Sequence, residues 1–240
     1  CPARASCRAR GFSLVELAVA LFVITLLVGS LLVPLTTQVE QRQISDTQKA
    51  LEDIKEALLG FALSNGFLPC PDVTSGTGAN DGAEDVSGAG TCVSSEGNVP
   101  WTTLGVIQSD VWGNRFRYRV DATFAQHPPA APFTLSSNAD IRVCGTAACT
   151  TLLTSSSPNG AAAVVLSHGK NGYGAMNSQT GVANTVPSSA DELENTNGNT
   201  TFVSRTPSAV GAAAGEFDDI VTWLSKYSVF NRMVSAGKLP

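Results

Sequence analysis

The sequence predicts an α+β fold, in which a long N-terminal helix packs on a small antiparallel sheet in a loop-rich body with disulfides. Three observations lead to this fold class. An apolar run without charges, Leu17–Leu35, is continued by residues at helical spacing. Short runs of strand length follow only after residue 100, separated by segments rich in Gly, Ser and Pro. Four cysteines follow the helix, and no two of them form a C-x-x-C pair, which disfavours a zinc or thioredoxin-like site.

The first predicted element is the apolar half of the helix, at residues 12–35. It is about 24 residues long, or about 36 Å as an α-helix, which is enough to cross a bilayer core of about 30 Å. Arg4, Arg8 and Arg10 precede it. Positive charge before a span keeps that end in the cytoplasm. We therefore expect a single-pass inner-membrane protein whose C-terminal domain is periplasmic or extracellular.

The helical pattern continues through residues 36–66, where it becomes amphipathic. Apolar residues recur at helical spacing and charged residues fill the other faces. The apolar positions are Ile44, Leu51, Ile54, Leu58, Phe61 and Ala62. Asn65-Gly66 is a suitable helix end, because Gly readily takes the left-handed conformation after the last turn. The prediction is one helix of about 54 residues, whose first half is apolar on all sides and whose second half is amphipathic.

Residues 67–240 are predicted to form the globular domain. Residues 72–98 form a long loop, and Trp101–Leu104 starts a short ordered element. The predicted strands are Arg115–Val120, Phe133–Leu135, Ile141–Val143 and Ala162–Ser167. Residues 216–235 are predicted to be helical or mixed, with an apolar face at Ile220, Trp223 and Leu224.

The four cysteines of the globular domain allow three disulfide pairings. The sequence-local choice is Cys70–Cys92 with Cys144–Cys149. Such bonds persist in an oxidising compartment, which agrees with a periplasmic placement. The alternative is four buried free thiols.

Composition and motifs exclude several function classes. The formal net charge is −5, so the body offers no basic face for phosphates, and we expect no nucleic-acid partner. The sequence has no G-x-S-x-G, P-loop or H-E-x-x-H motif. Both histidines, His127 and His168, lie beside Pro or Gly and are predicted to be loop residues rather than bases. We predict no catalytic residue and a protein that is not an enzyme.

One acid, Glu16, interrupts the start of the apolar segment. An unpaired carboxylate is costly in lipid, and an intramembrane acid is a candidate functional residue that needs a partner. The alternative is a carboxylate at headgroup depth, close to the end of the segment.

The sequence around Glu16, RGFSLVEL from Arg10 to Leu17, resembles the processing site of type IV prepilins and type II secretion pseudopilins. The resemblance implies that residues 1–11 are a leader, which prepilin peptidase removes after Gly11, and that Phe12 is then N-methylated. It also implies that Glu16 of one subunit neutralises the Phe12 amine of its neighbour. Two buried charges that must meet set the register between subunits, because either one alone stays unpaired.

The resemblance implies a structural subunit of a type II secretion pseudopilus or a type IV pilus-like filament, assembled by helix packing. Its implied partners are other pilin-like subunits, prepilin peptidase, an inner-membrane platform and, through it, a cytoplasmic ATPase. Gly29 and Pro34 weaken the helix. The resemblance suggests that this stretch unwinds during assembly, and the alternative is a tolerated membrane kink. The rival function is a membrane-anchored protein with a periplasmic ligand-binding or enzymatic domain and no filament role.

A second resemblance covers Asp110–Tyr118 (DVWGNRFRY), which is similar to the turn into the first sheet strand of major pseudopilins. That family binds calcium in an acidic C-terminal loop, so the resemblance implies a calcium site here. The acids in the C-terminal part of this chain that could form such a loop are Asp191, Glu192, Glu194, Glu216, Asp218 and Asp219. The expected ligands are Glu194, Glu216, Asp218 and Asp219, whose hard oxygens suit calcium. The alternative is that Asp218 and Asp219 cap a helix and face water.

Overall fold

The computed structural model describes residues 13–73 and 82–239, without the side chains of residues 29–36. The chain divides into two compact units, residues 1–44 and residues 45–240. One helix, α1 (Leu14–Asn65), contributes residues to both units. The predicted long helix is confirmed to within two residues at its start.

The sequence specifies both ends of α1. The helix begins with a capping box, in which the Glu16 N–H donates to Ser13 Oγ (3.2 Å) and the Ser13 N–H donates to Glu16 Oε2 (2.9 Å). It ends at Asn65, where Gly66 takes a φ of 91° and its N–H donates to the Ala62 carbonyl (2.7 Å). A left-handed glycine after the last turn is a common way to end a helix.

The second unit is built on a four-stranded antiparallel sheet with the order β1-β2-β4-β6. The strands are β1 (Glu96–Asn98), β2 (Arg117–Val120), β4 (Ala161–Ser167) and β6 (Ile220–Ser225). All seven residues of β4 are buried. Its unbroken apolar sequence fits a strand that is covered on both faces.

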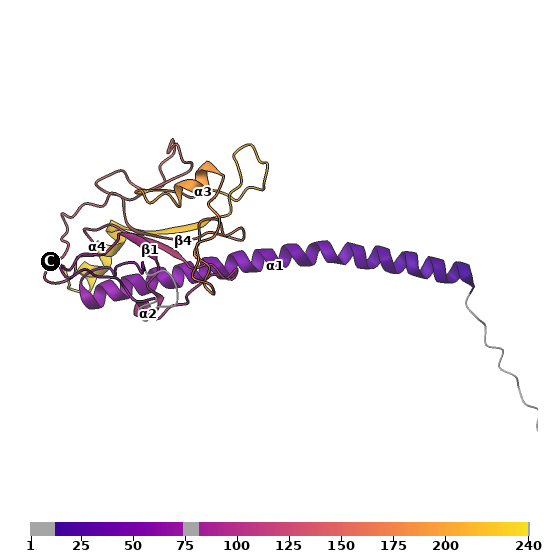
Figure 1. Cartoon of the computed structure of the whole chain (residues 1–240), viewed down its shortest axis with the longest axis horizontal. Coiled ribbons are helices and arrows are strands. Elements are labelled where there is room, and N and C mark those ends of the chain that lie inside the picture. The colour runs from indigo at the N-terminus through magenta and orange to yellow at the C-terminus, as the bar shows by residue number, and fades with distance from the viewer. Residues whose placement is uncertain (1–12, 74–81, 240) are drawn as a thin grey trace, which may run out of the picture. The chain divides into compact units, whose positions relative to one another are not determined.

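Two apolar clusters hold the layers of this unit together. On one face of the sheet, Leu51 and Leu58 of α1 share a cluster with Tyr118 of β2. On the other face, Val164 of β4 shares a cluster with Phe202. Phe202 belongs to a two-stranded sheet of β3 (Arg142–Cys144) and β5 (Thr201–Val203). The four-stranded sheet therefore lies between the C-terminal part of α1 and the smaller sheet (Figure 1).

Three short helices complete the unit: α2 (Trp101–Leu104), α3 (Ala190–Glu194) and α4 (Lys226–Ser235). The prediction of an ordered element at Trp101–Leu104 is confirmed. The mixed prediction for residues 216–235 is also confirmed, because β6 is followed directly by α4. The predicted common apolar face of Ile220, Trp223 and Leu224 was wrong, because within β6 Leu224 faces the α1 side and Trp223 the opposite side, as alternation in a strand requires.

Two strand predictions were wrong in part. The smaller sheet is parallel, because β3 pairs with β5 in the same direction, so the sheet structure is not all antiparallel. The predicted strand Phe133–Leu135 is not a strand. Pro132 precedes it and has no N–H to donate to a ladder. Phe133 is buried instead against Phe124, with ring centroids 4.9 Å apart.

Disulfides link Cys70 to Cys92 and Cys144 to Cys149, which is the sequence-local pairing. The first closes a sequence separation of 22 residues and the second a separation of 5. The alternative of four free thiols is therefore wrong. Cys70 belongs to the cluster that packs on α1, so the first disulfide joins the long loop to the core.

Candidate functional site

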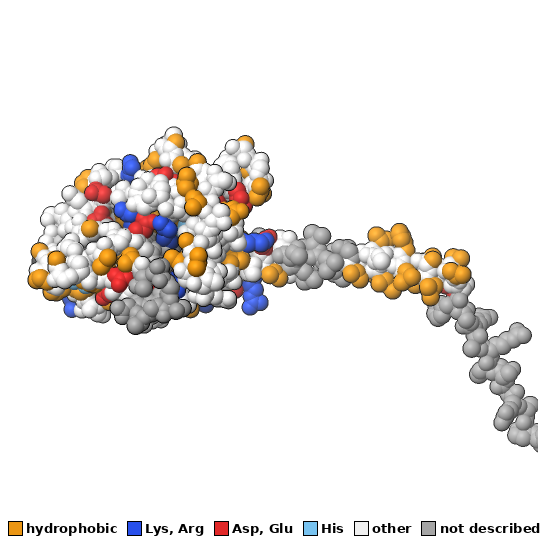
Figure 2. All heavy atoms as spheres, viewed as in Figure 1, with side chains coloured by type: hydrophobic (Ala, Val, Ile, Leu, Met, Phe, Trp, Pro, Cys, Tyr) orange, Lys and Arg blue, Asp and Glu red, His pale blue; other side chains and the backbone are white. Residues whose placement is uncertain are grey.

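The first candidate site is the apolar N-terminal part of α1. From Leu14 to Val28, the large apolar side chains are exposed, between 46% at Val23 and 88% at Leu14. They follow one another along the sequence and therefore lie on every face of the helix rather than on one. Orange side chains cover much of this segment in Figure 2. An exposed apolar surface of this kind marks a segment that is completed by lipid or by another protein.

Glu16 is the one acidic residue of this segment, Leu14–Val28. Its Oε2 accepts the hydrogen bond from the Ser13 N–H, and the side chain is exposed. The Glu16 carboxylate makes no hydrogen bond to a described residue other than Ser13. The carboxylate can therefore cap its own helix and still receive a positively charged partner.

Several predicted residues lie outside the described part of the chain. Gly11 and Phe12 are among them. Gly29 and Pro34 lie within α1, whose backbone is helical there, but their side chains are outside the description. Within the described residues, none of the helices combines the length and the apolarity that crossing a membrane requires.

The second candidate site is a cluster of three carboxylates, from Glu192 of α3 and from Asp218 and Asp219 just before β6. One oxygen of each lies within 4.8 Å of the others. Glu192 and Asp219 are only 1% and 4% exposed, and Asp218 is half-buried. Carboxylates packed this closely repel one another unless a proton or a cation lies between them.

One oxygen of each carboxylate accepts hydrogen bonds from neighbouring residues. Glu192 Oε1 accepts from Asn171 Nδ2 (3.0 Å) and from the Asp218 N–H (3.1 Å). Asp218 Oδ2 accepts from the Asn171 N–H (2.8 Å). Asp219 Oδ2 accepts from Asn195 Nδ2 (2.7 Å).

The other oxygen of each carboxylate is buried and has no hydrogen-bond partner in the described part of the chain. These atoms are Glu192 Oε2, Asp218 Oδ1 and Asp219 Oδ1. Buried polar atoms almost always have a partner, so three such oxygens in one cluster need an explanation. The nearest base is the fully buried His168, whose Nδ1 lies 3.4 Å from Asp219 Oδ1.

Burial and mutual repulsion disfavour the ionised form of this cluster. Burial raises the pKa of Glu192 to about 7, and the charges of Asp219 and Asp218 add to the shift. Burial likewise raises the pKa of Asp218 to about 6, and the charges of Asp219 and Glu216 add to it. A hard cation would relieve both effects, because carboxylate oxygens are the ligands that Ca²⁺ prefers. The residues present fit a bound calcium ion.

Comparison with known proteins bears on the N-terminal segment. Residues 6–32 match the family model described as the prokaryotic N-terminal methylation motif. The chain carries the hallmark of type IV prepilins and pseudopilins. No curated protein and no solved structure matches the chain.

The prepilin motif includes Gly11, Phe12, Glu16 and Gly29, and it ends before Pro34. Proteins of this motif family are structural proteins rather than enzymes. The motif does not extend to the carboxylate cluster.

The predicted calcium ligands are only partly brought together. Asp218 and Asp219 lie in the cluster, but Glu194 and Glu216 do not belong to it. Glu194 accepts instead from two asparagine side chains of the following loop, at 2.7 and 3.0 Å. Residues two apart on a helix face different sides, so Glu192 points into the cluster when Glu194 does not. The alternative, in which Asp218 and Asp219 cap a helix and face water, is wrong, because Asp219 is buried and precedes a strand.

Sequence reasoning named Glu192 as a nearby acid but not as a ligand, and it missed Asn171 and Asn195, which also shape the cluster. Asn171 supplies both a backbone and a side-chain donor to the cluster. Asn171 lies in the loop after β4, whereas Glu192 and Asn195 lie in α3 and at its C-terminal cap, and these two segments meet only in the fold. No spacing in the sequence signals that they do.

Proposed function

We propose that the protein is a structural subunit of a type II secretion pseudopilus or of a type IV pilus-like filament. One observation carries the proposal. The prepilin motif coincides with a helical segment whose apolar side chains are exposed on every face and which contains a single acid, Glu16. Such a surface is stable in a bilayer or in a bundle of like helices, and a filament core is such a bundle.

In this proposal prepilin peptidase cuts after Gly11, and the new amino group on Phe12 is methylated. Glu16 then changes partner. In the single chain it caps its own helix through Ser13, and in the filament it accepts the Phe12 ammonium of the neighbouring subunit. Because a lone buried charge is costly, a subunit that joins out of register is disfavoured.

The proposal also includes the location and the helix break. The apolar part of α1, residues 12–35, anchors the subunit in the inner membrane before assembly. The domain that follows lies in the periplasm or outside the cell, an oxidising location that agrees with its two disulfides. Gly29 and Pro34 allow the helix to unwind as subunits leave the bilayer. The partners of the subunit in this proposal are other pilin-like subunits and an inner-membrane platform.

Two measurements test this function against the rival, a membrane-anchored domain with no filament role. Mass spectrometry of the mature protein should find methylated Phe12 at the amino terminus. The Glu16→Ala variant should be processed normally but lose assembly, because the Phe12 ammonium then has no partner. The matched control is Glu40→Ala, which removes an exposed acid from the same helix beyond the apolar segment. An intact leader, or filaments formed by Glu16→Ala as well as by the control, would favour the rival.

A second candidate function is calcium binding by the cluster of Glu192, Asp218 and Asp219. Two observations favour it: the three carboxylates converge, and each has one buried oxygen without a hydrogen-bond donor among the described residues. When bound, the cation would supply positive charge that neutralises the three acids and links α3 to the start of β6. Calcium would then stabilise the fold of the extracytoplasmic domain.

Thermal unfolding in calcium and in EDTA tests this second function. A ligand that binds only the folded state at 100 times its Kd stabilises by about 2.7 kcal/mol. We expect calcium to raise Tm for the wild type and for Glu194→Gln, whose side chain lies outside the cluster. We expect Glu192→Gln to lose most of this rise. Equal responses from the two variants, or no response in the wild type, would exclude the site.

A further inference from the structure

Strand β2 divides its side chains between the core and a pocket. Tyr118 and Val120 are fully buried in the α1-facing core. Arg117 and Arg119 alternate with them and therefore point to the opposite face of the sheet. There the Arg117 and Arg119 side chains are only 23% and 14% exposed, so other parts of the chain cover this face and keep most of the solvent out.

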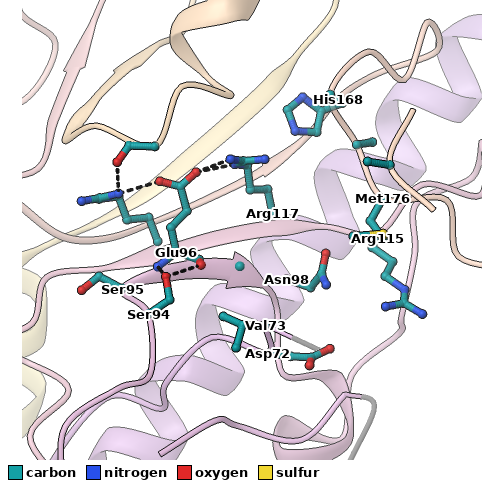
Figure 3. Close-up of a pocket in the computed structure, with 16 residues that line it drawn as sticks. Asp72, Val73, Ser94, Ser95, Glu96, Asn98, Arg115, Arg117, His168 and Met176 are labelled. Atoms are coloured by element: carbon teal, nitrogen blue, oxygen red, sulfur yellow. Dashed lines mark hydrogen bonds and ion pairs between the residues drawn. The ribbon is translucent and has the colours of Figure 1, made fainter. Parts of the chain in front are cut away.

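The pocket has a volume of about 500 Å³, within the range of small-molecule sites. Residues of β1 and β2 form its floor, and Met176 lies at its wall (Figure 3). The other wall residues include Gly174, Ala175, Ala183 and Gly198. All of its lining residues belong to the second unit.

The charges around the pocket do not balance. Glu96 Oε1 accepts from Arg117 Nε (2.6 Å), and Glu96 Oε2 accepts from Arg119 Nη1 (2.6 Å). Figure 3 shows this single carboxylate held between the two guanidinium groups. One acid shared by two arginines leaves one positive charge at this end. At the other end Asp72 and Arg115 contribute one charge of each sign. The pocket is thus positive in a chain whose net charge is −5.

Two nitrogen atoms at the pocket, one of Arg119 and one of His168, have no hydrogen-bond partner in the described part of the chain. Arg119 Nε is buried and has no acceptor. His168 lines the pocket, is fully buried, and makes no hydrogen bond at Nε2, which can donate or accept. Because buried donors normally find acceptors, these atoms point to a ligand that brings its own oxygens.

Apolar residues line the same pocket, among them Val73, Ala175 and Met176. They offer contacts to carbon, which an inorganic anion lacks. We propose that this pocket binds a small organic carboxylate, with its oxygens toward Arg117 and Arg119 and its carbon chain against the apolar wall. Guanidinium groups recognise carboxylates through paired N–H donors. The proposal goes beyond the filament function and depends neither on assembly nor on calcium.

The test is calorimetric titration of the full chain in a neutral detergent. The probe is N-acetylleucine, which has a carboxylate and a short apolar chain, and its neutral match is N-acetylleucinamide. We expect saturable binding of the acid and none of the amide. Arg119→Gln should weaken binding at least about tenfold. The matched control, Arg232→Gln, should bind as the wild type does, because Arg232 is an exposed arginine on α4.

A second variant keeps the test decisive if Arg119→Gln fails to fold. Ala183 is exposed and lines the pocket, so Ala183→Trp fills its mouth without removing an ion pair. This variant should also lose binding. The peptide Ala-Ala-Leu, with a free or an amidated C-terminus, distinguishes the source of the carboxylate. Tighter binding of the free peptide than of N-acetylleucine indicates a peptide terminus, and weaker binding indicates a free organic acid.

Four results would overturn the proposal. The first is the absence of saturable binding by both the acid and the free peptide. The second is equal binding of the acid and its amide. The third is undiminished binding by Ala183→Trp. The fourth is inorganic phosphate that binds as tightly as N-acetylleucine, since the apolar wall then contributes nothing.

Discussion

Arg205 joins three segments of the second unit through one guanidinium group. Its Nε donates to Asp191 Oδ2 of α3 (2.7 Å), its Nη1 to Ser208 Oγ (2.7 Å) and its Nη2 to the Gly215 carbonyl (3.2 Å). The guanidinium also lies 4.5 Å from the centre of the Phe217 ring. Arginine suits this position because its donors point in fixed, coplanar directions, which a lysine cannot reproduce.

We expect Arg205→Ala to lower the free energy of unfolding by about 3 kcal/mol, because it leaves the buried Asp191 carboxylate without its cation. Arg205→Lys should restore only part of this loss. Urea denaturation measures the free energy of unfolding of both variants. The control is Arg232→Ala, whose ion pair with Glu56 is exposed and should be worth at most about 1 kcal/mol. A loss for Arg205→Ala no larger than the control's would contradict this account.

The carboxylate cluster makes stability depend on pH. The pKa of Glu192 is raised from 4.5 to about 7 and that of Asp218 from 3.8 to about 6, so the folded state binds protons that the unfolded state has released. The stabilisation is complete below about pH 4 and is lost as pH rises through about 7, an effect on the order of 3 kcal/mol for each group. We therefore expect Tm in EDTA to fall between pH 5 and 8, other groups being equal.

The variant Glu192→Gln isolates this effect from other titrating groups. His127 works in the opposite direction, because burial lowers its pKa. The difference in Tm between wild type and Glu192→Gln removes that contribution. This difference should change with pH in EDTA, and calcium should shift it in favour of the wild type, because Glu192→Gln loses most of the calcium-dependent rise in Tm. A difference that is constant from pH 5 to 8 would show that Glu192 does not titrate in this range.

At the scale of elements, the two disulfides should differ in what they contribute. The Cys70–Cys92 bond closes the longer loop, with a separation of 22 residues against 5 for Cys144–Cys149. The loop-entropy relation gives about 3 kcal/mol for the first and about 2 kcal/mol for the second. We expect the double variant Cys70→Ser with Cys92→Ser to be the less stable in urea denaturation. The corresponding variant of Cys144 and Cys149 is its matched control. The reverse order would mean that strain or residual structure in the unfolded chain outweighs loop length.

The elements that the sequence predicted well are those with local signals. The end of α1 was predicted from Gly66, which acts within one turn, and its start was predicted to within two residues from the apolar run. The alternation in β2 likewise indicates a strand with one buried face, and the unbroken apolar run of β4 indicates a strand buried on both faces. In these cases the residues that determine the structure lie within a few positions of one another.

The elements that were mispredicted depend on distant contacts. Whether β3 pairs in parallel or antiparallel is decided by β5, about sixty residues later, and no local pattern records it. Phe133 has a strand-forming residue type but lies after Pro132 and fills a core position instead. The same limit applies to the carboxylate cluster. Asp218 and Asp219 were found from their local acidity, whereas Glu192 could be distinguished from Glu194 only by the orientation of α3.

At the scale of the whole molecule, the two units differ in how their apolar residues are used. In the first unit the apolar side chains of α1 between Leu14 and Val28 are exposed, and the prepilin motif covers this segment. In the second unit α1 contributes Leu51, Ile54 and Leu58 to the core, all at most 1% exposed. The part of the chain that needs other molecules to complete it is therefore separate from the part that completes its own core.

This separation predicts that residues 45–240 fold without the first unit. Residues 45–48 (Ser-Asp-Thr-Gln) match the S-x-x-Q capping pattern, which can pair two of the free N–H groups of a shortened helix that begins at Ser45. We expect the fragment to form both disulfides, to unfold cooperatively and to be monomeric by analytical ultracentrifugation. Processed full-length chains at the same concentration should self-associate, because only they expose Leu14–Val28. Leu58→Ala in the fragment should cost about 2–5 kcal/mol, which would confirm that the helix still supplies the core. A fragment that unfolds, or that associates as strongly as the full chain, would show that the second unit is not complete on its own.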